Sequence, residues 1–212
     1  MWRMEDVLDC YALPVQADEP LVCIDERPGQ LIADTRPPLP STVGQPARYD
    51  VEYERHGSCN LFMIFQPSAG WRTTKVTAHR KQEDFALLMR ELVDVHFPNA
   101  TKIRVVLDNL NIHSPASLYA TFEPAEARRI LRKLDFHFTP KHGSWLNMVE
   151  IELSILVRQC LGQRIPDMAS LASEVTAWQH RRNSQQATIR WQFSVEKART
   201  KLARLYPSSS LR

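Results

Sequence analysis

Two apolar stretches that each end on an aspartate constrain the fold of this chain more than any other feature. Val22-Cys23-Ile24 precedes Asp25, and a mostly β-branched run, residues 103–107, precedes Asp108. Runs this short are typical of buried strands and are too short for helices. A strand that ends on a carboxylate presents that carboxylate at the edge of a sheet, which raises the question of what the two acids face.

Hydrophobic periodicity along the chain predicts an α/β protein. We expect strands at 21–25, 29–34, 60–66, 70–77, 101–108 and 135–140, and helices at 5–11, 81–95, 123–134, 144–161, 168–182 and 194–205. The proline-rich segment 35–57 predicts a loop without a core of its own. The consecutive early strands predict an antiparallel meander, and the later alternation predicts parallel strands with crossover helices.

Composition and missing motifs exclude several classes of protein. With 212 residues, 43% of them hydrophobic, the chain suits one soluble domain. It has no secretory signal and no apolar run long enough for a membrane span, so we expect a cytoplasmic, nucleoid-associated protein with no membrane partner. Dinucleotide, P-loop and α/β-hydrolase glycine motifs are missing. The four cysteines form no CxxC pair and predict reduced, buried thiols rather than a zinc site.

Charge is unevenly distributed along the chain. Residues 125–212 carry a net +8 and residues 1–124 a net −5, which together give the overall +3. This asymmetry has two interpretations that the sequence leaves open: a polyanionic partner such as nucleic acid, or helix faces that are simply solvated.

Three acids form a candidate metal site. A lone aspartate after a strand is commonly a turn former or a helix cap, but two of them side by side would repel, and one pKa would rise unless a cation compensates. Glu150 lies on the apolar face of the helix expected at 144–161. With Leu146 at zero and about 100° per residue, Glu150 falls near 40° and Glu152 near 240°, at the margin of that face. We therefore expect Glu150, and not Glu152, to reach Asp25 and Asp108.

Four motifs in order resemble the catalytic domain of mariner-like bacterial insertion-sequence transposases, which are DDE superfamily endonucleases. These are LVCIDERPGQL, VVLDNLNIH, TPKHGSWLNMVEIELS and RQCL, and the resemblance runs from about residue 20 to 207. It implies an RNase H-like fold, Mg²⁺ dependence with Mn²⁺ as a substitute, and cut-and-paste DNA transposition. It also implies transposon ends and target DNA as partners, and is compatible with a homodimer.

The resemblance assigns the three acids by position. Asp25 matches the first acid, Asp108 in the D-N-x-x-x-H motif matches the second, and Glu150 after S-x-L-N-x-x matches the third, all three as metal ligands. The Asp108–Glu150 spacing of 42 positions is longer than is usual for the group. The helix-turn-helix modules that usually precede this domain have no counterpart, which leaves a truncated copy, a frameshifted product and an isolated catalytic domain open. We interpret residues 1–20 as a linker remnant, 21–207 as the catalytic domain and 208–212 as a disordered tail.

Other polar residues around these motifs are candidate DNA contacts. The set comprises His113, Lys141, His142, Ser144, Trp145 and Arg158. His113 would orient a carboxylate, touch a phosphate or remain a solvated loop residue. Ser144 could also cap a helix, and both roles can hold together, whereas a tryptophan such as Trp145 lies more commonly at the edge of the core than against DNA bases.

Three functions remain open from the sequence. The first is a metal-dependent nuclease and strand transferase. The second is a non-catalytic DNA-binding remnant of a transposase, and the third is a cellular RNase H-like nuclease.

Overall fold

A five-stranded mixed sheet forms the centre of the molecule. The computed structural model describes residues 1–206, so the tail expected at 208–212 lies outside the described residues. The strands are β1 (Leu21–Asp34), β2 (Tyr53–Gln66), β3 (Trp71–Thr77), β4 (Ile103–Leu107) and β5 (Leu134–Phe138). Their order across the sheet is β3-β2-β1-β4-β5.

Pairing in the sheet confirms both halves of the predicted topology. Strands β1, β2 and β3 form an antiparallel meander through the turn after Gln66. Strand β4 pairs with β1 in parallel, and β5 pairs with β4 in parallel. Helical segments connect β3 to β4 and β4 to β5. Parallel strands such as β4 and β5 need a long crossover connection of this kind, because a tight turn cannot join them.

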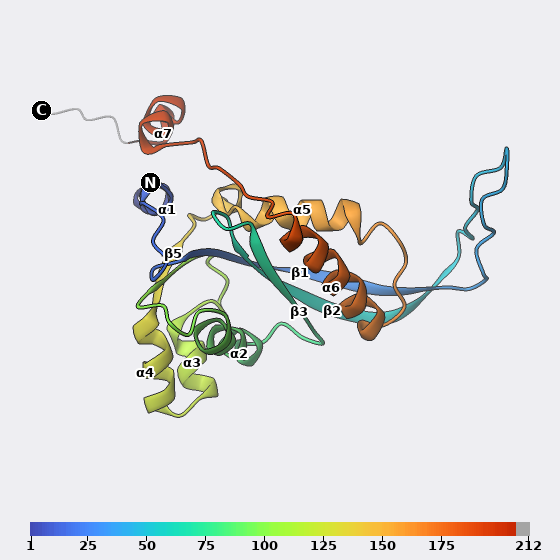
Figure 1. Ribbon diagram of the computed structural model, residues 1–212, viewed down its shortest axis with the longest axis horizontal. Coiled ribbons are helices and arrows are strands. Elements are labelled where there is room, and N and C mark those ends of the chain that lie inside the picture. Colours follow the sequence, from blue (N-terminus) through green and yellow to red (C-terminus); the bar gives the residue numbers. More distant parts are fainter. Residues whose placement is uncertain (207–212) are drawn as a thin grey trace, which may run out of the picture.

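The long β1–β2 hairpin corrects the prediction of two short strands followed by a loop. β1 continues through Pro28 and Gly29 to Asp34, with a register shift between Gln30 and Ile32, and β2 begins at Tyr53. Residues 53–58 of β2 are exposed throughout, so no alternation of apolar and polar residues marks this half of the strand. The hairpin projects well away from the body of the molecule, at the right of Figure 1.

Helices cover both faces of the sheet (Figure 1). They are α1 (Trp2–Ala12), α2 (Gln82–Glu91), α3 (Pro115–Thr121), α4 (Pro124–Lys133), α5 (Val149–Gln159), α6 (Met168–Ser184) and α7 (Val195–Lys201). One core cluster joins a face of the sheet to α1, α5, α6 and α7, and a second joins the other face to α2, α3 and α4. Helix α1 buries Met4, Val7 and Leu8 in the first cluster, so the N-terminal segment is part of the packed body.

Two helical predictions need correction. Helix α3 lies in a stretch for which no helix was expected, and Pro115 at its first turn suits a helix start. The long helix expected at 144–161 is shorter, because Ser144–Leu146 forms a separate 3-10 turn and Asn147 has an extended backbone. Leu146 is therefore not on α5.

All four cysteines are buried and free, as predicted. Burial raises the pKa of Cys10 and of Cys23 to about 12, so these thiols stay protonated at neutral pH.

Candidate active site

Parallel pairing of β1 with β4 brings Asp25 and Asp108 to neighbouring positions. Cys23 is paired with Val106, so two residues further along each strand the two acids follow in register. Alternation with Cys23 places Asp25 on the face that α5 covers, while Asp108 directly follows Leu107, the last residue of β4. Asp25 is buried at 8% exposure, and its Oδ1 accepts a hydrogen bond from the Glu26 amide at 2.8 Å.

The pKa of Asp25 responds to the charges of both other candidate acids, Asp108 and Glu150. Burial and, to a smaller extent, the negative charges of Glu150, Glu26 and Asp108 together raise the pKa of Asp25 to about 7, against the Glu26 amide, which lowers it. Of the two strand-end aspartates, Asp25 is the one whose pKa rises, mainly through burial and in smaller part through the repulsion expected from the sequence. Glu150, second residue of α5, is half-buried.

A buried histidine lowers the pKa of Asp108 and so favours its ionised form, in contrast to Asp25. His113 Nδ1 lies 2.6 Å from Asp108 Oδ1, and its Nε2 lies 3.0 Å from the Glu26 carboxylate. Burial alone raises the pKa of Asp108, but the His113 ring and the Leu110 amide outweigh burial and lower it. His113 is 2% exposed, a placement that favours the carboxylate-orienting role over phosphate contact.

Glu26 and Arg80 belong to the same group of charged side chains as Asp108 and His113. Neither residue was predicted from the sequence. Glu26 follows Asp25 on β1 and so faces the opposite side of the sheet, where His113 lies against Phe85. Its carboxylate is 3% exposed and lies 3.3 Å from Arg80 Nη1. The pattern that could have identified it is the adjacency of two acids at the end of a buried strand.

Asn147 anchors the start of α5 next to β1. The residue is fully buried, and its Nδ2 donates to the Ile24 carbonyl at 2.9 Å. Because Ile24 precedes Asp25 and Asn147 lies three residues before Glu150, this bond fixes the separation of the two acids' backbones. It gives the S-x-L-N motif a structural reason.

The position of Glu152 contradicts the sequence-based helix phase. Glu152 is completely buried rather than marginal, with Oε2 3.3 Å from Arg72 Nε of β3 and Oε1 2.7 Å from Arg182 Nη2 of α6. The buried face of α5 is centred on Val149, Glu152, Leu153 and Leu156. Counting Leu146 as part of the helix displaced the expected face toward Glu150.

The donor set suits a hard divalent cation, although the acids are not gathered around one. Four carboxylates, Asp25, Glu26, Asp108 and Glu150, share this end of the sheet with two cationic side chains, His113 and Arg80. When all six are charged, two negative charges are left uncompensated, which matches Mg²⁺ or Mn²⁺ bound by oxygen ligands. Within residues 1–206, no three His, Cys, Asp or Glu side chains lie close enough together to hold a metal ion as they stand.

The candidate DNA contacts of the loop before α5 lie at the surface. Lys141, His142 and Ser144 are exposed, and His142 has a left-handed backbone with φ 62°. Trp145 is 49% exposed and stacks on Trp191, with ring centroids 6.4 Å apart. In the part of the chain that the structure describes, Ser144 makes no capping hydrogen bond with its side chain.

Arg158 lies apart from this loop, in the last turn of α5. It is exposed and lines a shallow hollow with Arg181 and Glu174. The structure therefore does not bring Arg158 together with the other candidate DNA contacts.

Comparison with known proteins decides the family. The DDE superfamily endonuclease profile matches residues 20–172, which include Asp25, Asp108 and Glu150. This chain belongs to the DDE superfamily endonuclease family. No curated protein sequence matches it.

The solved structures to which this DDE endonuclease is similar confirm its RNase H-like fold. One is the Mos1 transposase paired-end complex with the left transposon end, at 14% identity and a TM-score of 0.55. A second is the Mos1 strand transfer complex, at 13% identity and a TM-score of 0.54. The alignments cover 88% of this chain but 59% and 58% of the Mos1 chains, so the present chain spans under two thirds of either.

No helix within residues 1–206 of the DDE endonuclease is both long and apolar enough to cross a bilayer.

Proposed function

We propose that this chain is a transposase catalytic domain that cleaves DNA strands and joins them to target DNA with the help of Mg²⁺ or Mn²⁺. The observation that carries the proposal is that Asp25 lies on β1 and Asp108 directly follows the neighbouring parallel strand β4, with Asp108 and Glu150 both close enough to raise the pKa of Asp25. Family membership supports the same chemistry.

Asp25, Asp108 and Glu150 are the residues that would hold the metal. When bound, divalent ions at such a site activate a water or a 3′-hydroxyl and stabilise the leaving oxygen of the phosphodiester. The remaining residues have positioning roles. His113 keeps Asp108 ionised and oriented, Glu26 holds His113 from the other side, and Asn147 fixes the start of the Glu150 helix against β1.

The proposed partners are transposon ends and target DNA, and a homodimer would pair two ends. Lys141, His142, Ser144 and Trp145 are proposed to contact DNA beside the acids, with Arg158 further along α5. An insertion-sequence origin and a nucleoid location belong to the same proposal.

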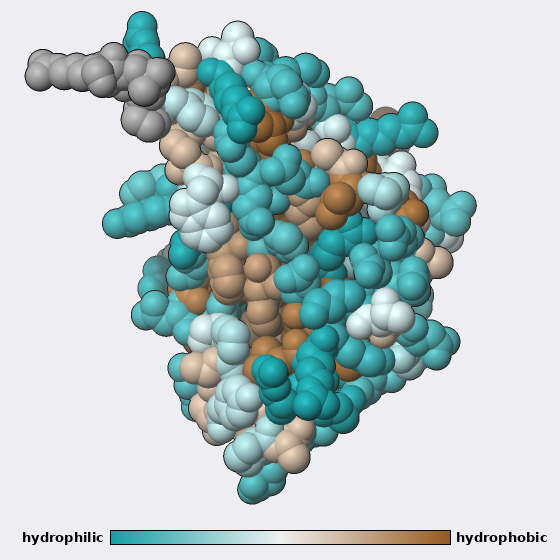
Figure 2. Space-filling view, turned by 90° about the vertical axis from the view of Figure 1, so that its left-hand side faces the viewer, coloured by the Kyte–Doolittle hydropathy of each residue, from teal (hydrophilic) through white to brown (hydrophobic). Residues whose placement is uncertain are grey.

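Most side chains on the face seen in Figure 2 are hydrophilic, with an apolar strip near its middle.

A non-catalytic DNA-binding remnant is the alternative. The observation in its favour is that, within residues 1–206, the acids are not close enough together to hold a metal as they stand. The two functions differ in whether added metal produces cleavage.

Nicking of supercoiled plasmid in Mg²⁺ or Mn²⁺ tests the proposal. We expect the wild-type chain to nick, and Asp25→Asn and Asp108→Asn to abolish nicking without loss of the folded state. Asp135→Asn is the matched control, because Asp135 is a half-exposed aspartate on β5, paired in register with the start of β4. Tight DNA binding without nicking by the wild type would establish the remnant instead, and full activity in either active-site variant would refute the assignment of the acids.

A further inference from the structure

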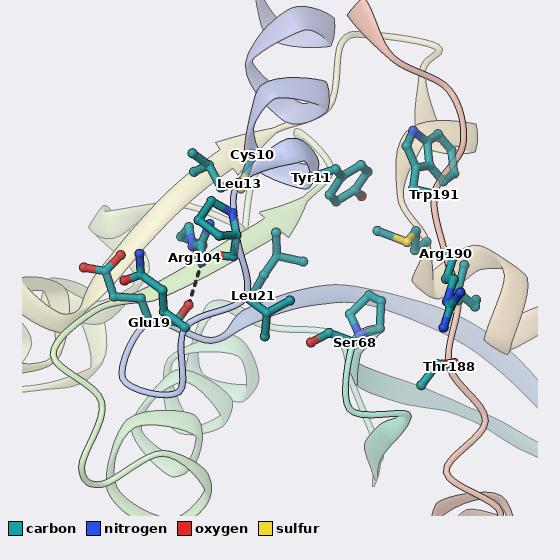
Figure 3. A pocket seen from close by; sticks show the side chains of 16 residues that line it. Cys10, Tyr11, Leu13, Glu19, Leu21, Ser68, Arg104, Thr188, Arg190 and Trp191 are labelled. Carbon is teal, nitrogen blue, oxygen red and sulfur yellow. Dashed lines mark hydrogen bonds between the residues drawn. The ribbon is translucent and has the colours of Figure 1, made fainter.

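A cavity of about 390 Å³ lies on the α5 side of the sheet, at the opposite end of the strands from the acids. Its walls come from the end of α1 and the segment after it, the start of β1 and β4, the β2–β3 turn and residues 188–191 (Figure 3). This volume lies in the range of small-molecule sites, which run from about 300 to 1,000 Å³. Nothing in the proposed cleavage reaction uses it.

Arg104 is a buried cation in the wall of this cavity without an anionic partner. The residue is 5% exposed, and its Nη2 donates only to the backbone carbonyls of Pro14 and Glu19. No carboxylate of residues 1–206 lies within ion-pair distance of it. Asp135, its register partner on β5, lies 3.6 Å from His137 instead.

The Glu19 carboxylate, which lines the same cavity, forms no ion pair with Arg104 in the part of the chain that the structure describes. In Figure 3 it lies on the side of Arg104 away from Trp191. A buried charge without a partner is costly, so the fold maintains an electrostatic field that favours an anion in the cavity.

The opposite side of the cavity adds a second cation and an aromatic surface. Figure 3 shows Arg190 and Trp191 across the cavity from Arg104, with Tyr11 beside Trp191. The Tyr11 and Trp191 rings lie 5.4 Å apart between centroids. Trp191 Nε1 and Arg104 Nε are both buried, and neither has a hydrogen-bond partner among the described residues. Both residues thus lie in the cavity wall with a buried N–H that makes no hydrogen bond among the described residues.

We propose that this cavity binds a nucleotide, with its phosphate between Arg104 and Arg190 and its base against Tyr11 and Trp191. Two arginines favour a phosphate, and aromatic rings give a base a stacking surface worth roughly 1–3 kcal/mol. Ser68 and Thr188 in the walls offer hydroxyls for the sugar. The ligand is either a free nucleotide or an unpaired nucleotide of a DNA strand, since both present the same groups.

The site is distinct from the proposed active site. Asp108 follows Arg104 by four residues along the direction of β4. At the rise per residue of a β-strand, this separates the two positions by about 13 Å. The Tyr11 hydroxyl, at the cavity wall, donates to the Leu146 carbonyl at 2.7 Å. The inference goes beyond the proposed cleavage, and its test measures binding without metal, so failure of one does not affect the other.

Binding is measured by titrating tryptophan-labelled protein with deoxyadenosine monophosphate and following the five indole N–H signals by NMR. Trp191→Phe assigns the Trp191 signal. We expect that signal to move at millimolar nucleotide, with inorganic phosphate or deoxyadenosine alone binding more weakly. If the Trp191 signal stays unmoved, or if phosphate alone binds as tightly as the nucleotide, the proposal is overturned.

Two substitutions and a control identify the phosphate contacts. Arg104→Gln and Arg190→Gln should each weaken binding roughly tenfold or more, the order expected when a hydrogen bond to a charged group is lost. Arg190 is exposed, so its variant keeps the test decisive even if the Arg104 variant does not fold. Arg128→Gln, an exposed arginine of α4, should bind as the wild type does. Unchanged affinity in Arg190→Gln overturns the proposal.

Oligonucleotides distinguish the two sources of the ligand. If single-stranded oligodeoxyadenylate moves the Trp191 signal and its duplex does not, the ligand is an unpaired nucleotide of DNA. If the mononucleotide alone moves it, the ligand is a free nucleotide. Both results support the nucleotide site. If neither the oligonucleotide nor the mononucleotide moves the Trp191 signal, the proposal is overturned.

Discussion

His113 lies between two carboxylates, with Nδ1 2.6 Å from Asp108 and Nε2 3.0 Å from Glu26. Burial by itself lowers the pKa of this imidazole, but the two acids outweigh burial and raise it to about 9. The ring is therefore a buried imidazolium at neutral pH. It provides the positive charge that allows Asp108 to stay ionised beside Asp25.

The first prediction concerns His113→Asn. Because the folded-state pKa exceeds the ordinary value of 6.5, the stability from this group is complete below about pH 6.5 and is lost as pH rises through about 9. The variant should thus be less stable than the wild type by about 2–3 kcal/mol at pH 6, with a smaller deficit at pH 10. Urea unfolding at the two pH values measures this.

The matched control for His113 is His142→Asn. His142 is an exposed loop residue with φ 62°, a conformation that asparagine also adopts readily. The free energy of unfolding of His142→Asn should equal that of the wild type at both pH values. A deficit in His113→Asn that is the same at pH 6 and pH 10 would show that His113 contributes packing rather than charge.

The second prediction concerns Asp25 and metal. Burial, together with the charges of Glu150, Glu26 and Asp108, raises the pKa of Asp25 to about 7, so the metal-free protein should lose stability from this group as pH rises from about 4 to about 7. Metal binding requires the ionised acid, so Mg²⁺ or Mn²⁺ should raise the melting temperature more at pH 8 than at pH 5.5. Asp25→Asn should remove both effects. Equal stabilisation by metal in Asp25→Asn and wild type would contradict the role of Asp25.

The sequence was most informative where a run of apolar side chains has the same bounds as a strand of the backbone. The buried run that ends on Asp108 predicted β4 and the edge that carries the acid, because all five residues of β4 face the core. The outer half of β2, residues 53–58, was missed because these residues are all exposed, so pairing with the backbone of β1, not burial, defines this part of the strand.

Buried charges were the least predictable part of the site. Arg72 and Arg104 lie on strands, are almost completely buried, and have partners more than 75 residues away in the sequence. No local pattern distinguishes such an arginine from one on a solvated face. Glu152 was misplaced for a related reason, since its two arginines come from β3 and α6.

The third prediction separates Glu150 from Glu152. Glu152→Gln leaves Arg72 buried without its counter-charge, so the free energy of unfolding should fall by about 3–5 kcal/mol. Glu150→Gln removes a half-buried acid from a repulsive cluster and should leave stability nearly unchanged or raise it, while metal-dependent nicking is lost. Urea unfolding and the plasmid assay on the same preparations measure both. A stable Glu152→Gln together with a destabilised Glu150→Gln would reverse the two roles.

The fourth prediction concerns the salt dependence of DNA binding. The basic excess of residues 125–212 should give sequence-indifferent binding that weakens steeply with salt. Arginines already paired with acids should contribute little: Arg129, for example, lies 2.7 Å from both Asp94 and Glu126. Lys141, exposed beside the proposed active site, should contact a phosphate.

Lys141→Gln should therefore reduce the slope of log K against log salt by about one, with a similar loss of affinity for every DNA sequence. Arg129→Gln is the matched control and should leave the slope unchanged, because its charge is already neutralised within the protein. Fluorescence anisotropy with random and terminal-repeat duplexes at several salt concentrations measures both. An equal change of slope in the two variants would show that the bulk charge of the chain, rather than the loop before α5, binds the DNA. Much tighter binding to a terminal repeat at equal salt would show that this domain reads sequence.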